Sequence, residues 1–351
     1  MKTKKTKRRT QRGLFDETFR QEKLEKQGDP LIKMKSIIDW EAFRPIIEQS
    51  ITEPVKGPGG RPPYDSILKF KMLILQRLYN ISDEQLEYQV NDRLSFMRFL
   101  DLTIADDVPD CNTIRYFRDI LIRKGVIEKI FESFDEMLKT KGYIAQEGSI
   151  IDASFVEVPR QRNTRDENKQ IKGGGIPEEW DAPENKHKVP HKDTDARWTK
   201  KNYQSYYGYK DHVKVDAKSK LITRYKVTDA SVHDSQTLKE LLDETDKGKT
   251  VHADSAYTGQ DDLLQEKEVL SEICEKGCRY KKLTDEQIGN NKVKSKIRTR
   301  VEHVFGFIEN SMNGSFIRTI GIKRAEGVIG LMNLTYNMRR FLYLHEVRLS
   351  S

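Results

Sequence analysis

Three acidic residues stand in segments of the sequence that are otherwise apolar. Asp152 interrupts the run IIDASF, Asp254 ends the run VHADS, and Glu302 lies beside Val301 next to an apolar helical stripe. Burying a carboxylate is costly unless a positive charge pairs with it. Three such groups brought together repel one another and gain protons unless divalent cations lie between them. Hard oxygen ligands suit Mg²⁺ or Mn²⁺, so the pattern favours a metal site.

Two such ions about 4 Å apart can activate a water or a 3′-hydroxyl and stabilise the leaving oxygen of a phosphodiester. For Asp254 alone, a simpler interpretation is an N-cap for the segment beginning near Gln260, or a turn aspartate. The sequence contains no GxxxxGK[ST], GxGxxG or GxSxG motif, so nucleotide-loop and serine-hydrolase functions lack their main evidence.

The elements that must position these acids follow from periodicity. The residues predict strands at 148–159, 206–215, 221–227, about 249–254 and 270–274, and helices at 235–243, 261–267 and about 292–310. If the first and fourth strands are neighbours, they bring Asp152 and Asp254 together, and the last helix can place Glu302 against them. Residues 160–202 are polar and contain GGG, which indicates a long, partly disordered insertion.

The first part of the chain has a helical pattern. Helices are predicted at 66–79, 82–90, 112–123 and 126–139. Three short helices, with Arg115 and Arg118 on the third, are compatible with a helix-turn-helix and equally with plain helical packing.

Charge points to a polyanionic partner. The 351 residues carry a net charge of +8, and two runs, at 2–12 and 292–300, are basic without an acid. Such runs are usually solvated surface, but two of them in a basic chain favour nucleic acid. No signal peptide or membrane span is evident, and the Cys274-x-x-x-Cys278 pair has no second ligand pair, so free thiols in a reducing compartment are expected.

The order of motifs resembles that of the bacterial DDE-type insertion-sequence transposases, specifically the insertion-sequence five group of the insertion-sequence four superfamily. The resemblance rests on VPDCNTIRYFR, DASFVE, KDTDARWTKK, YGYKDHVKVD, VTDASVHDS, HADSAYTG, RTRVEHVFGFIE and LMNLTYNMRRFLYL, and covers nearly the whole chain. It implies an α/β fold: a ribonuclease H-like catalytic domain, with a mixed sheet flanked by helices, after an all-α N-terminal domain. The expected division is a basic arm at 1–30, a helical DNA-binding domain at 31–142 and a catalytic domain at 143–345.

The resemblance implies that Asp152, Asp254 and Glu302 are the catalytic and metal-binding acids, holding two Mg²⁺ or Mn²⁺ ions. Arg298 keeps the family's spacing to the glutamate, but Ser295 and Glu309 stand where the family has a tyrosine and a lysine. Arg298 is expected to contact phosphate or support Glu302, against an ordinary helical ion pair. The other residues expected to contact DNA or support the site are Arg300, Lys210, His212, Arg197, Lys200, Lys201, His233, Asp234, Arg115 and Arg118.

The expected function is that of a DNA transposase, a cytoplasmic and nucleoid-associated bacterial enzyme. It binds double-stranded DNA at the ends of its element, frees 3′-hydroxyls and transfers them to target DNA, acting as a homodimer. Two alternatives remain: a metal-dependent nuclease of the same fold, and a catalytically silent DNA-binding protein derived from a transposase.

Overall fold

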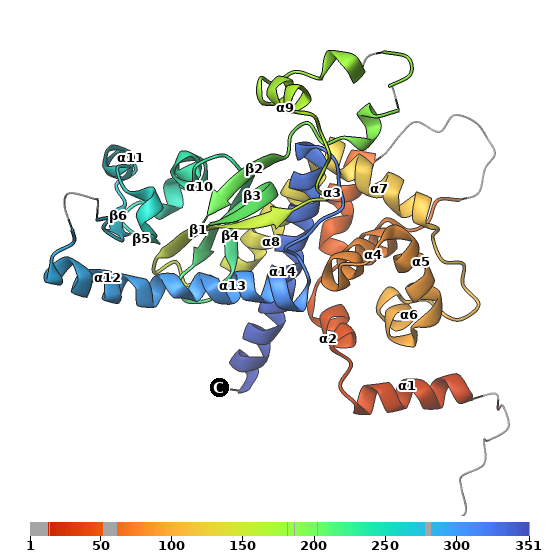
Figure 1. Ribbon diagram of the computed structural model, residues 1–351. Coiled ribbons are helices and arrows are strands. Elements are labelled where there is room, and N and C mark those ends of the chain that lie inside the picture. The colour runs from red at the N-terminus through yellow and green to blue at the C-terminus, as the bar shows by residue number, and fades with distance from the viewer. Residues whose placement is uncertain are drawn as a thin grey trace, which may run out of the picture.

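The structure is a computed structural model, and it describes residues 13, 15–51, 62–180, 182–185, 187–201, 203–277 and 282–350 (Figure 1). The basic run at 2–12, predicted to be a flexible arm, lies outside the described residues, as does Cys278. Cys111 and Cys274 are free thiols. Among the described residues, no helix is both long and apolar enough to cross a membrane.

The chain has a helical first part and a second part that contains both strands and helices. The α-helices are α1 (Asp16–Lys26), α2 (Pro30–Ile37), α3 (Arg44–Ile51), α4 (Ser66–Tyr79), α5 (Asp83–Asp92), α6 (Leu94–Leu100), α7 (Cys111–Arg123), α8 (Val126–Thr140), α9 (Arg165–Lys172), α10 (Leu238–Leu241), α11 (Asp261–Glu266), α12 (Asp285–Arg298), α13 (Glu302–Gly306) and α14 (Ile322–Ser350). The strands are β1 (Ser149–Glu157), β2 (Arg197–Lys201), β3 (Gln204–Asp216), β4 (Ile222–Asp229), β5 (Thr250–Ala253) and β6 (Leu270–Ile273). Short helical turns are η1 (Glu41–Phe43), η2 (Glu178–Trp180), η3 (Val189–His191), η4 (Asp234–Thr237), η5 (Glu244–Asp246), η6 (Ser255–Tyr257), η7 (Thr299–Val301) and η8 (Phe307–Ser311).

The strands form one mixed sheet with β1 at its centre. β1 pairs antiparallel with β3 and parallel with β5; β3 also pairs antiparallel with β2 and β4, and β5 pairs parallel with β6. An antiparallel half joined to a parallel half through the first strand, with helices on both faces, is the ribonuclease H-like fold that the resemblance implied (Figure 1). Gly208 lets the β1 and β3 backbones approach closely, since a Cβ there would lie 2.3 Å from the Val156 carbonyl oxygen.

The two faces of the sheet have different covers. One face carries Ile150, Val156 and Val213, which share a core with η7, α13, α14 and the N-terminal helices. The other face carries Ile151 and Val251, which pack against α10, η6 and α11 in a smaller core. The predicted alternation along the first strand therefore feeds two separate apolar layers.

The helical layer, α2 to α8, begins its helices with the caps that the sequence encodes. The side chain of Asp65 accepts from the N–H groups of Ile67 and Leu68, and Ser82 accepts from Gln85 N–H at 3.2 Å. The helices predicted at 66–79, 82–90, 112–123 and 126–139 all form, within two residues of the expected ends.

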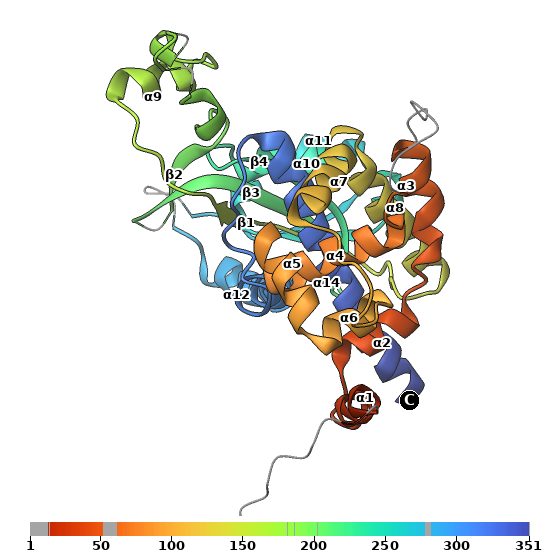
Figure 2. The same ribbon diagram turned by 90° about the vertical axis from the view of Figure 1, so that its right-hand side faces the viewer.

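Helix α14 joins this layer to the sheet. It runs through the middle of the molecule and contacts α2, α4, α7, α8, β3 and β4 (Figures 1 and 2). Close approach requires small residues: a Cβ on Gly327 would lie 2.4 Å from an Ile122 side-chain carbon of α7. Its buried amides serve the sheet, because Asn337 both accepts from Ile222 N–H at 2.9 Å and donates to Ile222 C=O at 2.6 Å.

The insertion at 160–202 has more structure than its composition indicated. Helix α9 begins with a capping box between Thr164 and Glu167, and Trp180 donates its indole N–H to Glu167 at 2.6 Å. β2 was not predicted as a strand, yet it pairs with β3 along its whole length. The polar sequence lacks the apolar alternation that reveals a half-buried strand, because β2 is an edge strand with little burial. Figure 2 shows this segment projecting from the sheet.

Asp211 of β3 is buried against α14, and we predict a pH effect on stability from it. Burial raises its pKa from 3.8 to about 7, opposed by a hydrogen bond from Asn333. The folded state therefore holds the proton more tightly than the unfolded state, and this stability is lost as the pH rises from about 4 to 7. The free energy of unfolding of Asp211→Asn should be about 1–3 kcal/mol higher than that of wild type near pH 8, and equal to it near pH 4.

The control is Asp216→Asn. The Asp216 carboxylate accepts hydrogen bonds from Gln146 N–H, Ser219 N–H and the Ser219 hydroxyl, so this variant should lose stability near pH 8. Denaturant titration at the two pH values measures both effects. Equal losses in the two variants would contradict the role given to Asp211.

Candidate active site

The sheet brings two of the predicted acids together. β1 and β5 are parallel neighbours, with Ile151 level with Ala253, so the next residues are Asp152 on β1 and Asp254 directly after the end of β5. The negative charge of Asp254 is one of the causes that raise the pKa of Asp152, after its burial. The condition set by the sequence, that the first and fourth predicted strands are neighbours, is met.

Glu302 lies on the helical segment that crosses this part of the sheet. α12 contacts both β1 and β5, and η7 joins it to α13, which Glu302 begins (Figure 1). Val301 and Val304 are buried on the sheet side, whereas the Glu302 side chain is 61% exposed. Glu302 therefore faces solvent at the rim of the site.

Arg298 links the acids. Its guanidinium donates to Asp152 Oδ2 at 2.9 Å and lies 3.9 Å from Glu302 Oε1. The sequence offered a phosphate contact, support for Glu302 or a helical ion pair; the shorter contact is to Asp152, which none of these named. The spacing of four residues revealed the helical neighbour, but only the packing of α12 on β1 brings the strand acid within reach.

Asp152 is held in a costly environment. Its residue is 8% exposed, and burial raises its pKa to about 6, an effect to which Asp254 adds. The Ala153 N–H, Arg298 and Lys201 act in the opposite direction. The positive charges around Asp152 therefore offset only part of the penalty of burying its carboxylate.

Asp254 is both a cap and a neighbour of Asp152. Its Oδ1 accepts from Ala256 N–H at 2.8 Å and so begins η6. The cap serves η6 rather than the segment after Gln260, whose helix α11 has no side-chain cap. Capping uses one carboxylate oxygen, so the capping and the chemical interpretations of Asp254 are compatible.

Tyr257 is a residue that the sequence reasoning did not single out. It is fully buried, its hydroxyl has no hydrogen-bond partner among the described residues, and its pKa is raised by burial and by Asp234, Asp152 and Asp254. An unpartnered hydroxyl beside carboxylates is uncommon in a protein interior. The motif HADSAYTG contains it, but only the fold places it in η6, within the smaller core, where the charges of Asp234, Asp152 and Asp254 act on it.

Lys210, His212, His233 and Asp234, which were predicted to contact DNA or support the site, form hydrogen bonds within the protein. Lys210 donates to Asp234 Oδ1 at 2.8 Å and to the Val232 carbonyl at 2.6 Å. His212 is fully buried, bonds Thr228 at 2.9 Å, and burial lowers its pKa to about 4. His233 caps η4 through Ser235. In this arrangement Lys210 and His212 are shielded from solvent, so they support the strands around the site.

The remaining predicted cations divide into paired and open groups. Arg300 donates to the Ala217 carbonyl at 2.9 Å, and Arg197 donates to carbonyls that include Ile171 at 3.0 Å. Arg118 forms a two-pronged ion pair with Asp83 at 2.6 and 3.0 Å. Lys200, Lys201 and Arg115 are exposed. Exposed cations remain available to an anionic partner, whereas Arg118 is already neutralised.

The two departures from the family's pattern also fall near the acids. Glu309 accepts a hydrogen bond from Ser154, two residues after Asp152, at 3.2 Å. Ser295 lies 3.8 Å from the Cys274 sulfur. A carboxylate at position 309 adds negative charge on the side where the family has a lysine.

The donor set fits a hard divalent cation, because it consists of carboxylate oxygens, one of them strongly desolvated. The Arg298 guanidinium stands in as the cation between Asp152 and Glu302. Among the described residues, however, no three His, Cys, Asp or Glu side chains are grouped closely enough to hold a metal ion as they stand. The fit is therefore one of chemistry, with Arg298 as the competing partner.

The sheet is ribonuclease H-like, and Asp152 on β1 and Asp254 just after β5 lie at two neighbouring strands of it. The chain belongs to the family described as "Transposase DDE domain", whose model matches residues 144–338, more than half of its length. A second model, "Transposase domain (DUF772)", matches residues 19–119. Among solved structures, the chain is similar to the piggyBac transposase in a cryo-EM structure of its synaptic complex with hairpin DNA. That similarity has 13% identity and a TM-score of 0.43, and covers 92% of this chain and 76% of that chain.

We predict that the Tyr257 hydroxyl destabilises the folded protein. Because it is buried without a partner, Tyr257→Phe should raise the free energy of unfolding by about 1 kcal/mol in metal-free buffer. The matched control is Tyr209→Phe, which removes a hydroxyl that donates to Asp193 at 2.7 Å and should destabilise the protein. Urea unfolding of both variants is the measurement. A loss of similar size in both would mean that Tyr257 has a structural partner.

Proposed function

We propose that this chain is an insertion-sequence DNA transposase of the insertion-sequence five group, with Asp152, Asp254 and Glu302 as its catalytic acids. The observation that carries the proposal is the parallel pairing of β1 with β5 in a transposase-family domain, which aligns Asp152 and Asp254. The reaction frees a 3′-hydroxyl at each element end and transfers it to target DNA. We infer that 31–142 is the end-binding domain and that a homodimer joins two ends.

Asp152 and Asp254 present carboxylate oxygens from neighbouring strands, and Glu302 adds a third from the exposed side. These three would hold two Mg²⁺ or Mn²⁺ ions, which when bound activate the attacking oxygen and stabilise the leaving oxygen of the phosphodiester. The burial of Asp152 provides the driving force for a cation to bind, since its carboxylate is incompletely compensated. Arg298 orients Asp152 by a charge-assisted hydrogen bond and keeps positive charge beside the phosphate.

The DNA path fits the exposed cations of β2. Lys200 and Lys201 are exposed, and Lys201 lies near enough to Asp152 to lower its pKa. Phosphate contacts from such side chains give affinity, and they set the register of the scissile bond against the acids. Lys210, bonded to Asp234, lies on β3, the strand that pairs with β2.

One observation favours a second candidate, a catalytically silent DNA-binding protein. Arg298 is hydrogen-bonded to the Asp152 carboxylate, where a metal ion would bind, and Glu309 places a further negative charge near the site. If a divalent cation does not displace Arg298, the fold retains DNA binding without cleavage.

We predict metal-dependent cleavage by the wild-type protein. Duplex DNA carrying the gene's own flanks should be nicked at the flank boundaries with Mg²⁺ or Mn²⁺, and Asp254→Asn should lower the rate by at least about 10²-fold. Asp262→Asn, an exposed aspartate of α11, is the control and should cleave normally. Cleavage sites are mapped to single nucleotides. Binding without cleavage indicates the silent protein, and scattered cuts indicate a nuclease.

We also predict that metal binding is measurable without catalysis. At ten times its dissociation constant, Mg²⁺ should stabilise wild type by about 1.4 kcal/mol, read as a rise in melting temperature. Asp152→Asn should lose this response and Asp262→Asn should keep it. An identical Mg²⁺ response in Asp152→Asn would remove Asp152 from the metal site.

A further inference from the structure

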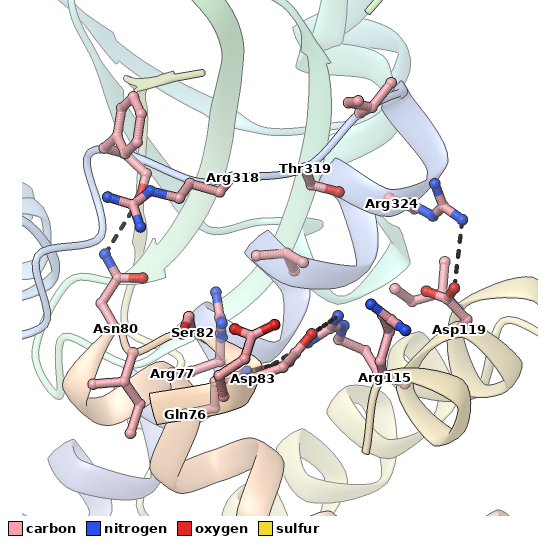
Figure 3. A pocket seen from close by; sticks show the side chains of 17 residues that line it. Gln76, Arg77, Asn80, Ser82, Asp83, Arg115, Asp119, Arg318, Thr319 and Arg324 are labelled. Atoms are coloured by element: carbon pink, nitrogen blue, oxygen red, sulfur yellow. Dashed lines mark hydrogen bonds and ion pairs between the residues drawn. The ribbon is translucent and has the colours of Figure 1, made fainter. Parts of the chain in front are cut away.

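A cavity of about 460 Å³ lies between the helical layer and the segment that leads into α14, apart from the candidate active site. Figure 3 shows its two walls: Arg77 and Arg115 belong to helices α4 and α7, whereas Arg318 precedes α14 and Arg324 lies in its first turn. Asn80 joins the walls, because its side-chain amide donates to the Asn313 carbonyl at 2.7 Å and the Phe316 carbonyl at 3.4 Å. The cavity is thus built from both parts of the chain.

The lining is rich in arginine. The cationic and acidic residues that line it are Arg77, Arg115, Arg118, Arg318, Arg324, Asp83, Glu84 and Asp119. Two acids are already used, since Asp83 binds Arg118 at 2.6 Å and Asp119 lies 3.4 Å from Arg324.

Three of these arginines, Arg77, Arg115 and Arg318, form no ion pair among the described residues, although Arg77 lies within the electrostatic reach of Asp83. Arg115 donates only to the neutral side chain of Asn112, and Arg318 is exposed and has no ion pair. Against them stands the single carboxylate of Glu84. The cavity therefore carries an excess of positive charge that the protein itself does not balance.

Arg77 is the strongest sign of a missing ligand. Its residue is only 9% exposed, and its Nε is buried without a hydrogen-bond partner. Burial, and then the neighbouring charge of Arg118, lower its pKa to about 10, and the Asp83 carboxylate acts in the opposite direction. A buried guanidinium that is only partly compensated, and whose Nε lacks a hydrogen-bond partner, destabilises a fold, so an anion in the cavity would remove part of that cost.

A second cavity continues the first. It has a volume of about 440 Å³ and shares Arg318, Thr319 and Ile320 with the first. Beyond them it is lined by Arg160 and Lys192, and by Asp193, which accepts a hydrogen bond from the Tyr209 hydroxyl. The Arg160 guanidinium is exposed, lies 3.5 Å from the Glu157 carboxylate, and lies 5.5 Å from the ring centre of Trp198 on β2. Cations spaced along two joined cavities suit an extended polyanion better than one small anion.

We propose that these two cavities form one groove that binds the phosphodiester backbone of duplex DNA, with Arg77, Arg115 and Arg318 contacting its phosphates. The inference rests on the proposed function, because it takes DNA as the polyanion. It adds the place on the protein where the DNA backbone binds. The groove begins at the helical layer and ends at the exposed cations of β2. Between them it passes the end of β1, the strand on which Asp152 lies. It contacts the backbone, so it supplies affinity and register rather than base readout.

The test is the salt dependence of DNA binding by the full chain, measured by fluorescence anisotropy with a duplex carrying the gene's flanks. Each lost phosphate contact should lower the slope of log affinity against log salt by about 0.9. The double variant Arg115→Gln/Arg318→Gln should therefore lose about 1.8 from the slope, and about 10- to 100-fold in affinity near 0.1 M salt. Both side chains are exposed, so folding should be retained.

The matched control removes two positive charges elsewhere. Lys129 of α8 and Lys239 of α10 are exposed, line neither cavity, and have no ion pair among the described residues. Lys129→Gln/Lys239→Gln should keep the wild-type slope. Equal slopes for both double variants would overturn the groove. Failure of wild type itself to bind duplex at low salt would instead overturn the proposed function.

Arg77 allows a second, independent test. Arg77→Met keeps much of the side-chain volume but removes the unpartnered charge, so the melting temperature should stay the same or rise. DNA affinity should nevertheless fall, by about tenfold near 0.1 M salt. A lower melting temperature with unchanged affinity would make Arg77 structural. If 10 mM inorganic phosphate stabilises wild type and yet no variant changes DNA binding, the cavity takes a free anion and the DNA groove is rejected.

Discussion

The burial of α14 is the constraint on which the rest of the structure depends. From Ala325 to Met338 nearly every residue is buried, since the helical layer covers one side and the sheet the other. Such a helix cannot expose polar groups to water, so Asn333 and Asn337 bond to β3 and to the β4 backbone. The α14 glycines bring the layers into contact. One helix therefore makes a single body of two parts that match two different transposase-domain models.

The second constraint is electrostatic and lies at the centre of the sheet. A parallel neighbour places Asp254 beside Asp152, and burial makes the pair unfavourable until positive charge approaches. Arg298 supplies that charge in the protein alone. The incompletely compensated carboxylate that Arg298 contacts is also the one that, in the proposed function, would bind a divalent cation. Stability and proposed chemistry therefore draw on one interaction.

The cations of the protein fall into two classes with different uses. Arg118, Arg300 and Lys210 are bonded within the fold and hold elements together. Arg77 and Arg318 lack such partners among the described residues and line the joined cavities. Net charge alone cannot separate these classes, since both contribute equally to it. The distinction follows from which helices and strands pack beside each side chain.

The sequence by itself determined the order and type of most elements, because apolar periodicity and capping residues act locally. The helices 66–79 and 112–123 and the central strand follow from it, the resemblance implied the ribonuclease H-like fold, and the roles of the three acids stay a prediction. Edge strand β2 was not predicted because few of its side chains are buried, and α9 was not predicted because it lies in a polar insertion. Only the tertiary structure decided that Arg298 holds Asp152, that Tyr257 lies beside the acids, and that Arg77 is buried without a partner. Each of these depends on residues far apart in the chain, whose distances are set by packing and not by spacing along the sequence.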